Sequence, residues 1–63
     1  MNEFSCLLTD VIRTTLTRCS YETCSEECRN YLWGVAFECN QVFNNDTYDA
    51  LWRTLIAICF PSH

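Results

Sequence analysis

The sequence has few turn-forming residues and no lysine. It contains one glycine, one proline and one histidine, and its four basic residues are all arginines. Knottins and β scaffolds need many turn residues, so the composition excludes both. With eight carboxylates and a net charge of −4, the chain neutralises few phosphates, which makes nucleic acids and anionic membranes poor partners. It holds no apolar run near the ~18 residues of a membrane span, and we expect no membrane insertion.

Cysteine is the residue that the chain has in excess. Six cysteines stand among 63 residues. A chain this short buries only about 60% of the surface that it exposes when unfolded, so its core needs support. An even count without a CxxC pair favours disulfides over a metal or redox site, and disulfides imply an oxidising compartment. We therefore expect one domain, residues 1–63, in a secreted extracellular protein without a bound metal or cofactor.

The first residues, MNEFSCLLTDVIRTTL, do not have the composition of a signal peptide. They lack a positively charged start, and Asp10 interrupts the apolar run. We interpret the chain as a mature form to which Met1 was added. Arrival in an oxidising space by another route is the alternative.

Apolar residues recur at helical spacing in three segments of the chain. The segments are residues 2–19, 24–43 and 46–59, and each has an apolar stripe along one face. Short polar turns separate them. Asp46 with Asp49 starts the third helix, and Pro61 ends it. The pattern predicts an all-α fold, a small up-down-up three-helix bundle stapled by three disulfides.

Residues that can cap helices stand at the first two helix starts. Asn2 or Ser5 could cap the first helix. Cys6 lies away from the apolar stripe of that helix, so either its bond lies at the helix edge or the helix begins after it. Thr23 begins a capping-box pattern before the second helix. Gly34 inside that helix costs about 1 kcal/mol relative to alanine, and it marks a close helix contact or a kink.

The heights of the cysteines in such a bundle limit how they pair. A helix rises about 1.5 Å per residue, so residues equally far from a turn lie at similar heights. On this basis we favour the pairs Cys6–Cys39, Cys19–Cys24 and Cys28–Cys59. The alternative exchanges two of these bonds and gives Cys19–Cys28 and Cys24–Cys59.

Few residues could carry catalysis or hold a metal. The only histidine is the last residue, His63, and without a positioned base no serine or cysteine is an activated nucleophile. Glu26 and Glu27 are adjacent, so on a helix they point in different directions and compensate the helix dipole. Cys24 and Cys28 have a spacing that can chelate zinc, although an even cysteine count favours disulfides. We expect that the protein is not an enzyme.

The residues Asn45-Asp46-Thr47 match the acceptor pattern for N-glycosylation in an exposed turn. The same residue types are expected where a helix begins, so capping is the alternative interpretation. Asn45 is a candidate glycosylation site only if the protein follows a eukaryotic secretory route.

Trp33 and Phe37 form the strongest functional feature of the sequence. On a helical wheel they lie opposite the cysteine stripe of the second helix, beside Arg29 and Asn30. An exposed Trp–Phe pair with an arginine beside it has the composition of a binding hot spot. Three other interpretations stay open: the helix kinks at Gly34, a chain terminus covers the pair, or the pair packs in a homodimer.

The run Cys19-x4-Cys24-x3-Cys28 is similar to the central cysteine run of the ciliate water-borne mating pheromones. Members of that family are acidic three-helix bundles with three disulfides. The resemblance covers residues 19–28, and the cysteine spacings on both sides differ from those of the family. Neither a disulfide pairing nor a site is carried over.

The main functional hypothesis is a secreted signalling or effector protein, such as a pheromone, hormone or toxin. It would bind a protein receptor or channel, and it could also self-associate as a homodimer. Disulfides would fix the helices before binding and so lower the ordering cost of the complex. The alternatives are a small ectodomain of a cell-surface receptor and an intracellular cysteine-rich module that binds a metal.

Overall fold

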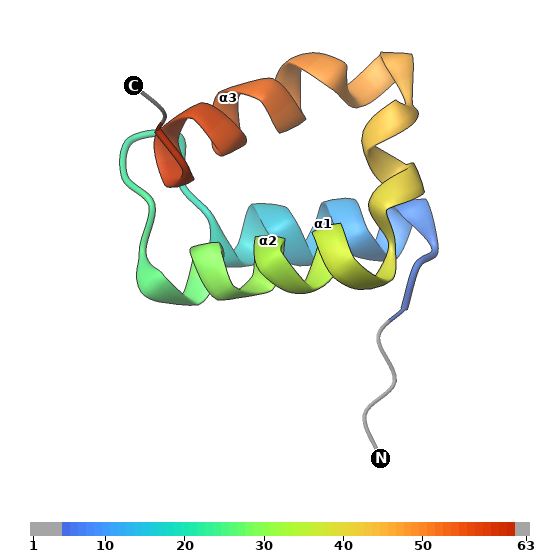
Figure 1. Ribbon diagram of the computed structural model, residues 1–63, viewed down its shortest axis with the longest axis horizontal. Helices are drawn as coiled ribbons and strands as arrows, with labels where there is room; N and C mark the ends of the chain where they lie inside the picture. Colours follow the sequence, from blue (N-terminus) through green and yellow to red (C-terminus); the bar gives the residue numbers. More distant parts are fainter. Residues whose placement is uncertain (1–4, 62–63) are drawn as a thin grey trace.

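The computed structural model describes residues 5–61, and this part of the chain is helical. Three α-helices, α1 (Leu8–Arg18), α2 (Glu26–Glu38) and α3 (Asp49–Cys59), run up, down and up (Figure 1). Two short 3-10 helices, η1 (Asn40–Asn44) and η2 (Asp46–Tyr48), lead from α2 to α3. Three disulfides join these elements. The predicted all-α, three-helix fold with three disulfides is confirmed.

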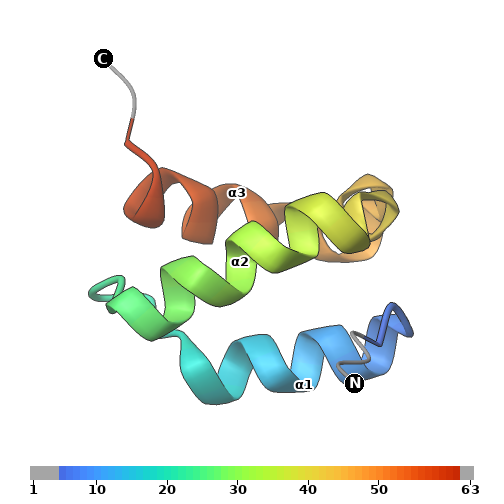
Figure 2. The ribbon, with the colours of Figure 1, turned by 60° about the horizontal axis from the view of Figure 1, so that its bottom comes forward.

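A hydrophobic core lies between the three α-helices. Each helix contributes residues at three-to-four spacing: Val11 from α1, Leu32 and Val35 from α2, and Trp52 and Leu55 from α3. These side chains are at most 2% exposed. Figure 2 shows α2 flanked by α1 on one side and by α3 on the other. Within residues 5–61, none of the helices has both the length and the hydropathy that crossing a bilayer requires.

The first helix begins later than the sequence pattern predicts. Leu8 is its first residue, and Leu7 stands at the N-cap position without a capping side chain. The Ser5 hydroxyl instead donates to the Asp10 carboxylate over 3.0 Å. Cys6 thus precedes the helix, which is one of the two predicted arrangements. The other predicted cap, Asn2, lies outside the described residues.

The second helix also starts later than predicted. Its N-cap is Ser25, not Thr23, and the Ser25 hydroxyl accepts a hydrogen bond from the backbone N–H of Cys28 over 3.2 Å. Glu26 and Glu27 then occupy the first turn, at the positive end of the helix dipole. Cys24 therefore lies outside the helix, in an extended loop.

The second helix ends five residues earlier than predicted, since it stops at Glu38 and not at residue 43. Cys39 leaves helical geometry with φ −140° and ψ 40°. The break is not at Gly34, which lies inside a continuous helix. After Cys39 the chain continues as η1 and turns toward α3 (Figure 1). Val42 still reaches the core, but from η1 and not from α2.

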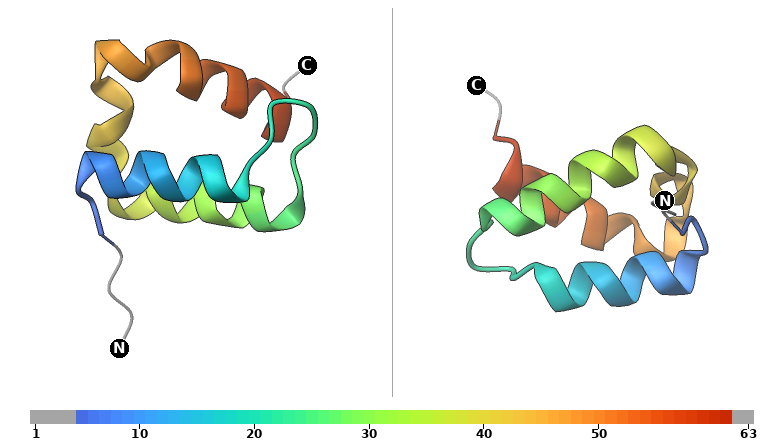
Figure 3. Two further views of the ribbon diagram at one scale, coloured as in Figure 1. Left: turned by 180° about the vertical axis from the view of Figure 1, so that it is seen from behind. Right: turned by 90° about the horizontal axis from the view of Figure 1, so that it is seen from below.

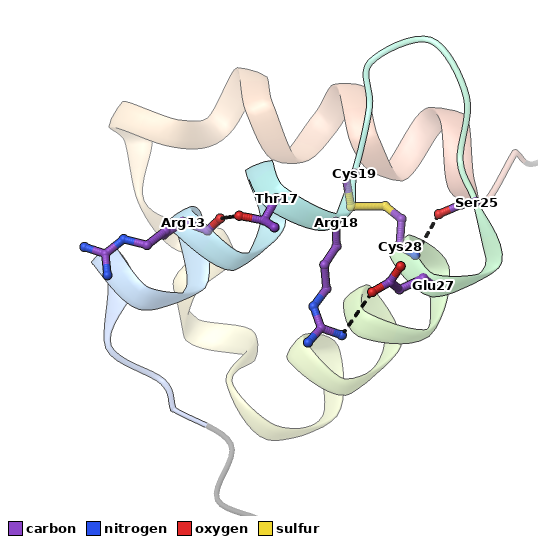
Figure 4. A network of polar contacts seen from close by, with 7 residues as sticks. All are labelled: Arg13, Thr17, Arg18, Cys19, Ser25, Glu27 and Cys28. Carbon is purple, nitrogen blue, oxygen red and sulfur yellow. Dashed lines mark hydrogen bonds and ion pairs between the residues drawn. A yellow bond between two sulfur atoms is a disulfide. The ribbon is translucent and has the colours of Figure 1, made fainter.

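The disulfides join Cys6 to Cys39, Cys19 to Cys28 and Cys24 to Cys59. The first bond is as predicted, and the other two follow the alternative pairing, so the favoured pairs Cys19–Cys24 and Cys28–Cys59 are wrong. The reason is the late start of α2. Cys24 in the loop is free to reach the end of α3, while Cys28, one turn into α2, faces the end of α1 (Figure 4).

Peptide mapping of the oxidised protein tests this pairing directly. An Arg or a Glu stands between every two successive cysteines, so trypsin and Glu-C together place each cysteine on its own peptide. We expect mass spectrometry to find the Cys24 peptide bonded to the Cys59 peptide and the Cys19 peptide bonded to the Cys28 peptide. Digestion at acidic pH suppresses exchange. A Cys19–Cys24 product would contradict the observed geometry.

Candidate binding surface

Trp33 and Phe37 lie on the outer face of α2. Trp33 is 53% exposed and Phe37 is 79% exposed. The two residues are one helical turn apart, and their rings stack with centroids 5.5 Å from each other. The exposure predicted for this pair is therefore present in the structure.

The opposite face of α2 explains why this pair points outward. Cys28, Leu32 and Val35 are buried at three-to-four spacing, which fixes the rotation of the helix about its axis. The helix is anchored to the core and to α1 along this arc. Trp33 and Phe37 lie on the remaining arc, where more than half of each side chain is exposed.

Phe60, the first residue after α3, packs against one side of Trp33. Its ring centroid is 5.4 Å from that of Trp33, and the two rings are tilted by 54°. The Cys24–Cys59 bond ties the end of α3 to the start of α2 and so places Phe60 there. A residue near the terminus thus covers part of Trp33, while about half of the indole stays exposed.

An apolar groove of about 320 Å³ runs beside Trp33 between α2 and α3. All of its lining side chains are apolar: Leu32, Trp33, Ala36, Phe43, Ile56 and Phe60. This volume lies near the lower end of the range for small-molecule pockets, and it suits one or two bulky side chains. Phe60 and Ile56 were not predicted from the sequence as part of this surface. The pairing of Cys59 with Cys24 is the signal that could have found Phe60.

Arg29 stands one turn before Trp33 on the exposed arc of α2, and Asn30 is exposed beside it. Between residues 5 and 61 the ion pairs are Arg18–Glu27 at 3.7 Å and Arg53–Asp49 at 2.9 Å. No carboxylate in that range therefore pairs with Arg29. Its guanidinium is available to a carboxylate from outside the chain, next to the aromatic pair.

The other arginine at this end of the bundle has partners within the chain. The Arg18 guanidinium pairs with Glu27 and lies 5.5 Å from the centre of the Tyr31 ring. Figure 4 shows this pair bridging the end of α1 and the first turn of α2, beside the Cys19–Cys28 bond. These contacts hold α1 against α2 on the side away from α3, so we assign them a structural role.

The remaining predicted sites have structural roles where the structure describes them. The Asn45 side chain caps η2 by accepting a hydrogen bond from the Thr47 backbone N–H over 2.9 Å. This contact engages the amide oxygen, and glycosylation of the amide nitrogen stays a prediction. His63 lies outside the described residues.

In comparisons with protein-family models, with curated proteins and with solved structures, nothing matched this chain.

The two tryptophans should differ sharply in their contribution to stability. Trp52 is 2% exposed, so Trp52→Ala should lower the free energy of unfolding by about 3–5 kcal/mol through the cavity that it leaves. Trp33→Ala removes two ring contacts at a half-exposed position and should lower it by about 1–2 kcal/mol. Chemical denaturation of the oxidised variants, followed by circular dichroism, measures both values. Equal losses would mean that Trp33 belongs to the core.

Proposed function

We propose that the protein is a secreted signalling or effector protein that binds a protein partner such as a receptor or channel. Binding would use the aromatic surface, which we define as Trp33, Phe37, Phe60 and Arg29. The observation that carries this proposal is the stacked Trp33–Phe37 pair, which is 53% and 79% exposed on a helix with a buried opposite face. Tryptophan and arginine are enriched among the residues that dominate binding energy at protein interfaces.

The disulfides support this proposal because they hold the aromatic surface in place before binding. Cys28 joins the first turn of α2 to α1, Cys24 joins the loop before α2 to α3, and Cys39 joins the end of α2 to Cys6. A partner would thus meet an ordered helix and would not have to order it, so less binding free energy is lost to conformational entropy. Three disulfides in a chain of this size are typical of extracellular proteins.

The groove beside Trp33 suggests how specificity would arise. Its apolar lining suits a bulky apolar side chain of the partner, such as leucine or phenylalanine. Arg29 stands one turn before Trp33 on α2 and has no ion pair in the described chain, and it would pair with a carboxylate of the partner. The partner surface should therefore present an apolar anchor close to an Asp or Glu.

Binding is favoured over catalysis by the chemistry of the described residues. The carboxylates at the start of α2 are exposed and adjacent in sequence, so they point in different directions, and Glu27 is engaged by Arg18. All six cysteines are in disulfides and cannot act as thiolate nucleophiles. We therefore propose a binding protein that is not an enzyme.

A binding assay on intact cells of the producing organism tests the role of the aromatic surface. Labelled protein should bind saturably, and unlabelled wild type should displace it. Trp33→Ala should weaken displacement by about 30-fold, which corresponds to a hot-spot loss of about 2 kcal/mol. Leu16→Ala is the matched control, because Leu16 is 54% exposed on α1, and it should compete like wild type.

Each variant first needs the wild-type disulfide map and circular dichroism, so that a binding loss reports on the surface and not on folding. If Trp33→Ala competes as well as wild type, the aromatic surface is not the binding site. If no saturable binding is found, the receptor hypothesis fails. Sedimentation of the free protein covers the remaining case: a dimer that Trp33→Ala abolishes and Leu16→Ala preserves would identify a second copy as the partner.

A further inference from the structure

Four of the six cysteine sulfurs gather at one end of the bundle. This is the end where the loop between α1 and α2 meets the last turn of α3 (Figures 1 and 3). The Sγ atoms of Cys24, Cys28 and Cys59 all lie within 4.8 Å of one another. The fourth, Cys19, is bonded to Cys28. The third disulfide, Cys6–Cys39, is formed by residues before α1 and after α2 and takes no part in this group.

The two disulfides in this cluster approach each other closely. The Sγ atoms of Cys28 and Cys59 belong to different bonds and are only 3.7 Å apart. In a tetrahedral zinc–thiolate site with Zn–S bonds of about 2.3 Å, neighbouring sulfurs are about 3.8 Å apart. The Cys28–Cys59 separation therefore already matches one edge of such a site. Of the other two edges among these three sulfurs, Cys24–Cys28 is at most 4.8 Å long and needs to shorten by about 1 Å at most. The Cys24–Cys59 edge is a disulfide, and it can lengthen to about 3.8 Å only once that bond is reduced.

The positions of the four cysteines suit a structural zinc site. Cys24 and Cys28 follow the C-x3-C spacing common among zinc ligands on neighbouring loops and helix starts. Cys59 supplies a third ligand from α3, and Cys19 stands at the end of α1. The four thus come from all three helical segments. Cys28 and Cys59 are buried, while Cys24 is partly exposed and leaves a route for a metal ion.

We propose that reduction of Cys19–Cys28 and Cys24–Cys59 converts this cluster into a four-cysteine zinc site that holds the same three helices together. Each disulfide takes up two electrons and two protons and yields two cysteine thiols. A dithiol reductant supplies both and becomes a disulfide, whereas a phosphine supplies the two electrons and becomes a phosphine oxide with oxygen from water, whose two protons go to the cysteine thiols. One Zn²⁺ then displaces four protons and forms four Zn–S bonds. One zinc centre thus takes the place of two disulfides. The free energy of zinc binding then contributes to the stability of the fold. This site is independent of the aromatic surface and of any receptor.

Titration of the fully reduced chain with Zn²⁺ alone, under anaerobic conditions and with a phosphine reductant, tests the site. Native mass spectrometry should find one zinc per reduced chain and none on the oxidised chain. Circular dichroism should show helix content rising with zinc and falling when a chelator is added. Co²⁺ in place of zinc should give the ligand-field bands of a tetrahedral tetrathiolate centre.

Cysteine variants separate a built site from adventitious binding to thiols. Loss of a residue that hydrogen-bonds to a metal ligand typically costs about 10–100-fold in metal affinity. Cys24→Ser and Cys59→Ser each remove a ligand itself, so each should weaken zinc binding by more than this. The double variant Cys6→Ser/Cys39→Ser removes two other thiols and should bind zinc like the reduced wild type. The proposal is overturned if the reduced chain retains no zinc. It is also overturned if Cys24→Ser and Cys59→Ser bind as tightly as the double variant.

Discussion

Covalent attachment of α2 at both ends is the constraint on which the rest of the structure depends. Cys24 and Cys28 tie its start to α3 and α1, and Cys39 ties its end to Cys6. A chain of 63 residues has too small a core to hold three helices firmly by burial alone. Each disulfide adds about 2–4 kcal/mol by restricting the unfolded chain. The core therefore needs to cover only one face of α2.

The exposed aromatic pair follows from this arrangement. Burial of the Cys28, Leu32 and Val35 face sets the rotation of α2, and the remaining arc faces solvent with Trp33 and Phe37 on it. Burying such side chains would stabilise a small protein considerably. Because they are exposed, the fold does not gain that stability. A disulfide-clamped fold can tolerate this loss. The stacked and exposed pair is thus a feature of the fold that folding itself does not explain, and for this reason we propose that it serves binding.

Helix phase was predictable from the sequence, and helix ends were less so. The spacing of Cys28, Leu32 and Val35 places one arc inside, whatever residue starts the helix. The start depends on local competition between caps, and Ser25 was chosen over Thr23. With Ser25 as the cap, Cys24 lies in the loop before the helix and can reach α3, while Cys28 keeps its helical position facing the end of α1. The late start was enough to exchange the partners of Cys24 and Cys28.

Local periodicity and composition thus predicted the three helical segments and the presence of disulfides. They also predicted the outward direction of Trp33 and Phe37. They did not predict the disulfide partners of Cys24 and Cys28. Nor did they predict the contact between Phe60 and Trp33 or the groove between α2 and α3. Periodicity acts within a single helix, where each residue's neighbours are three or four positions away. The other features depend on how two helices lie against each other. That arrangement is set by packing and by the loop before α2, and no pattern within one segment encodes it.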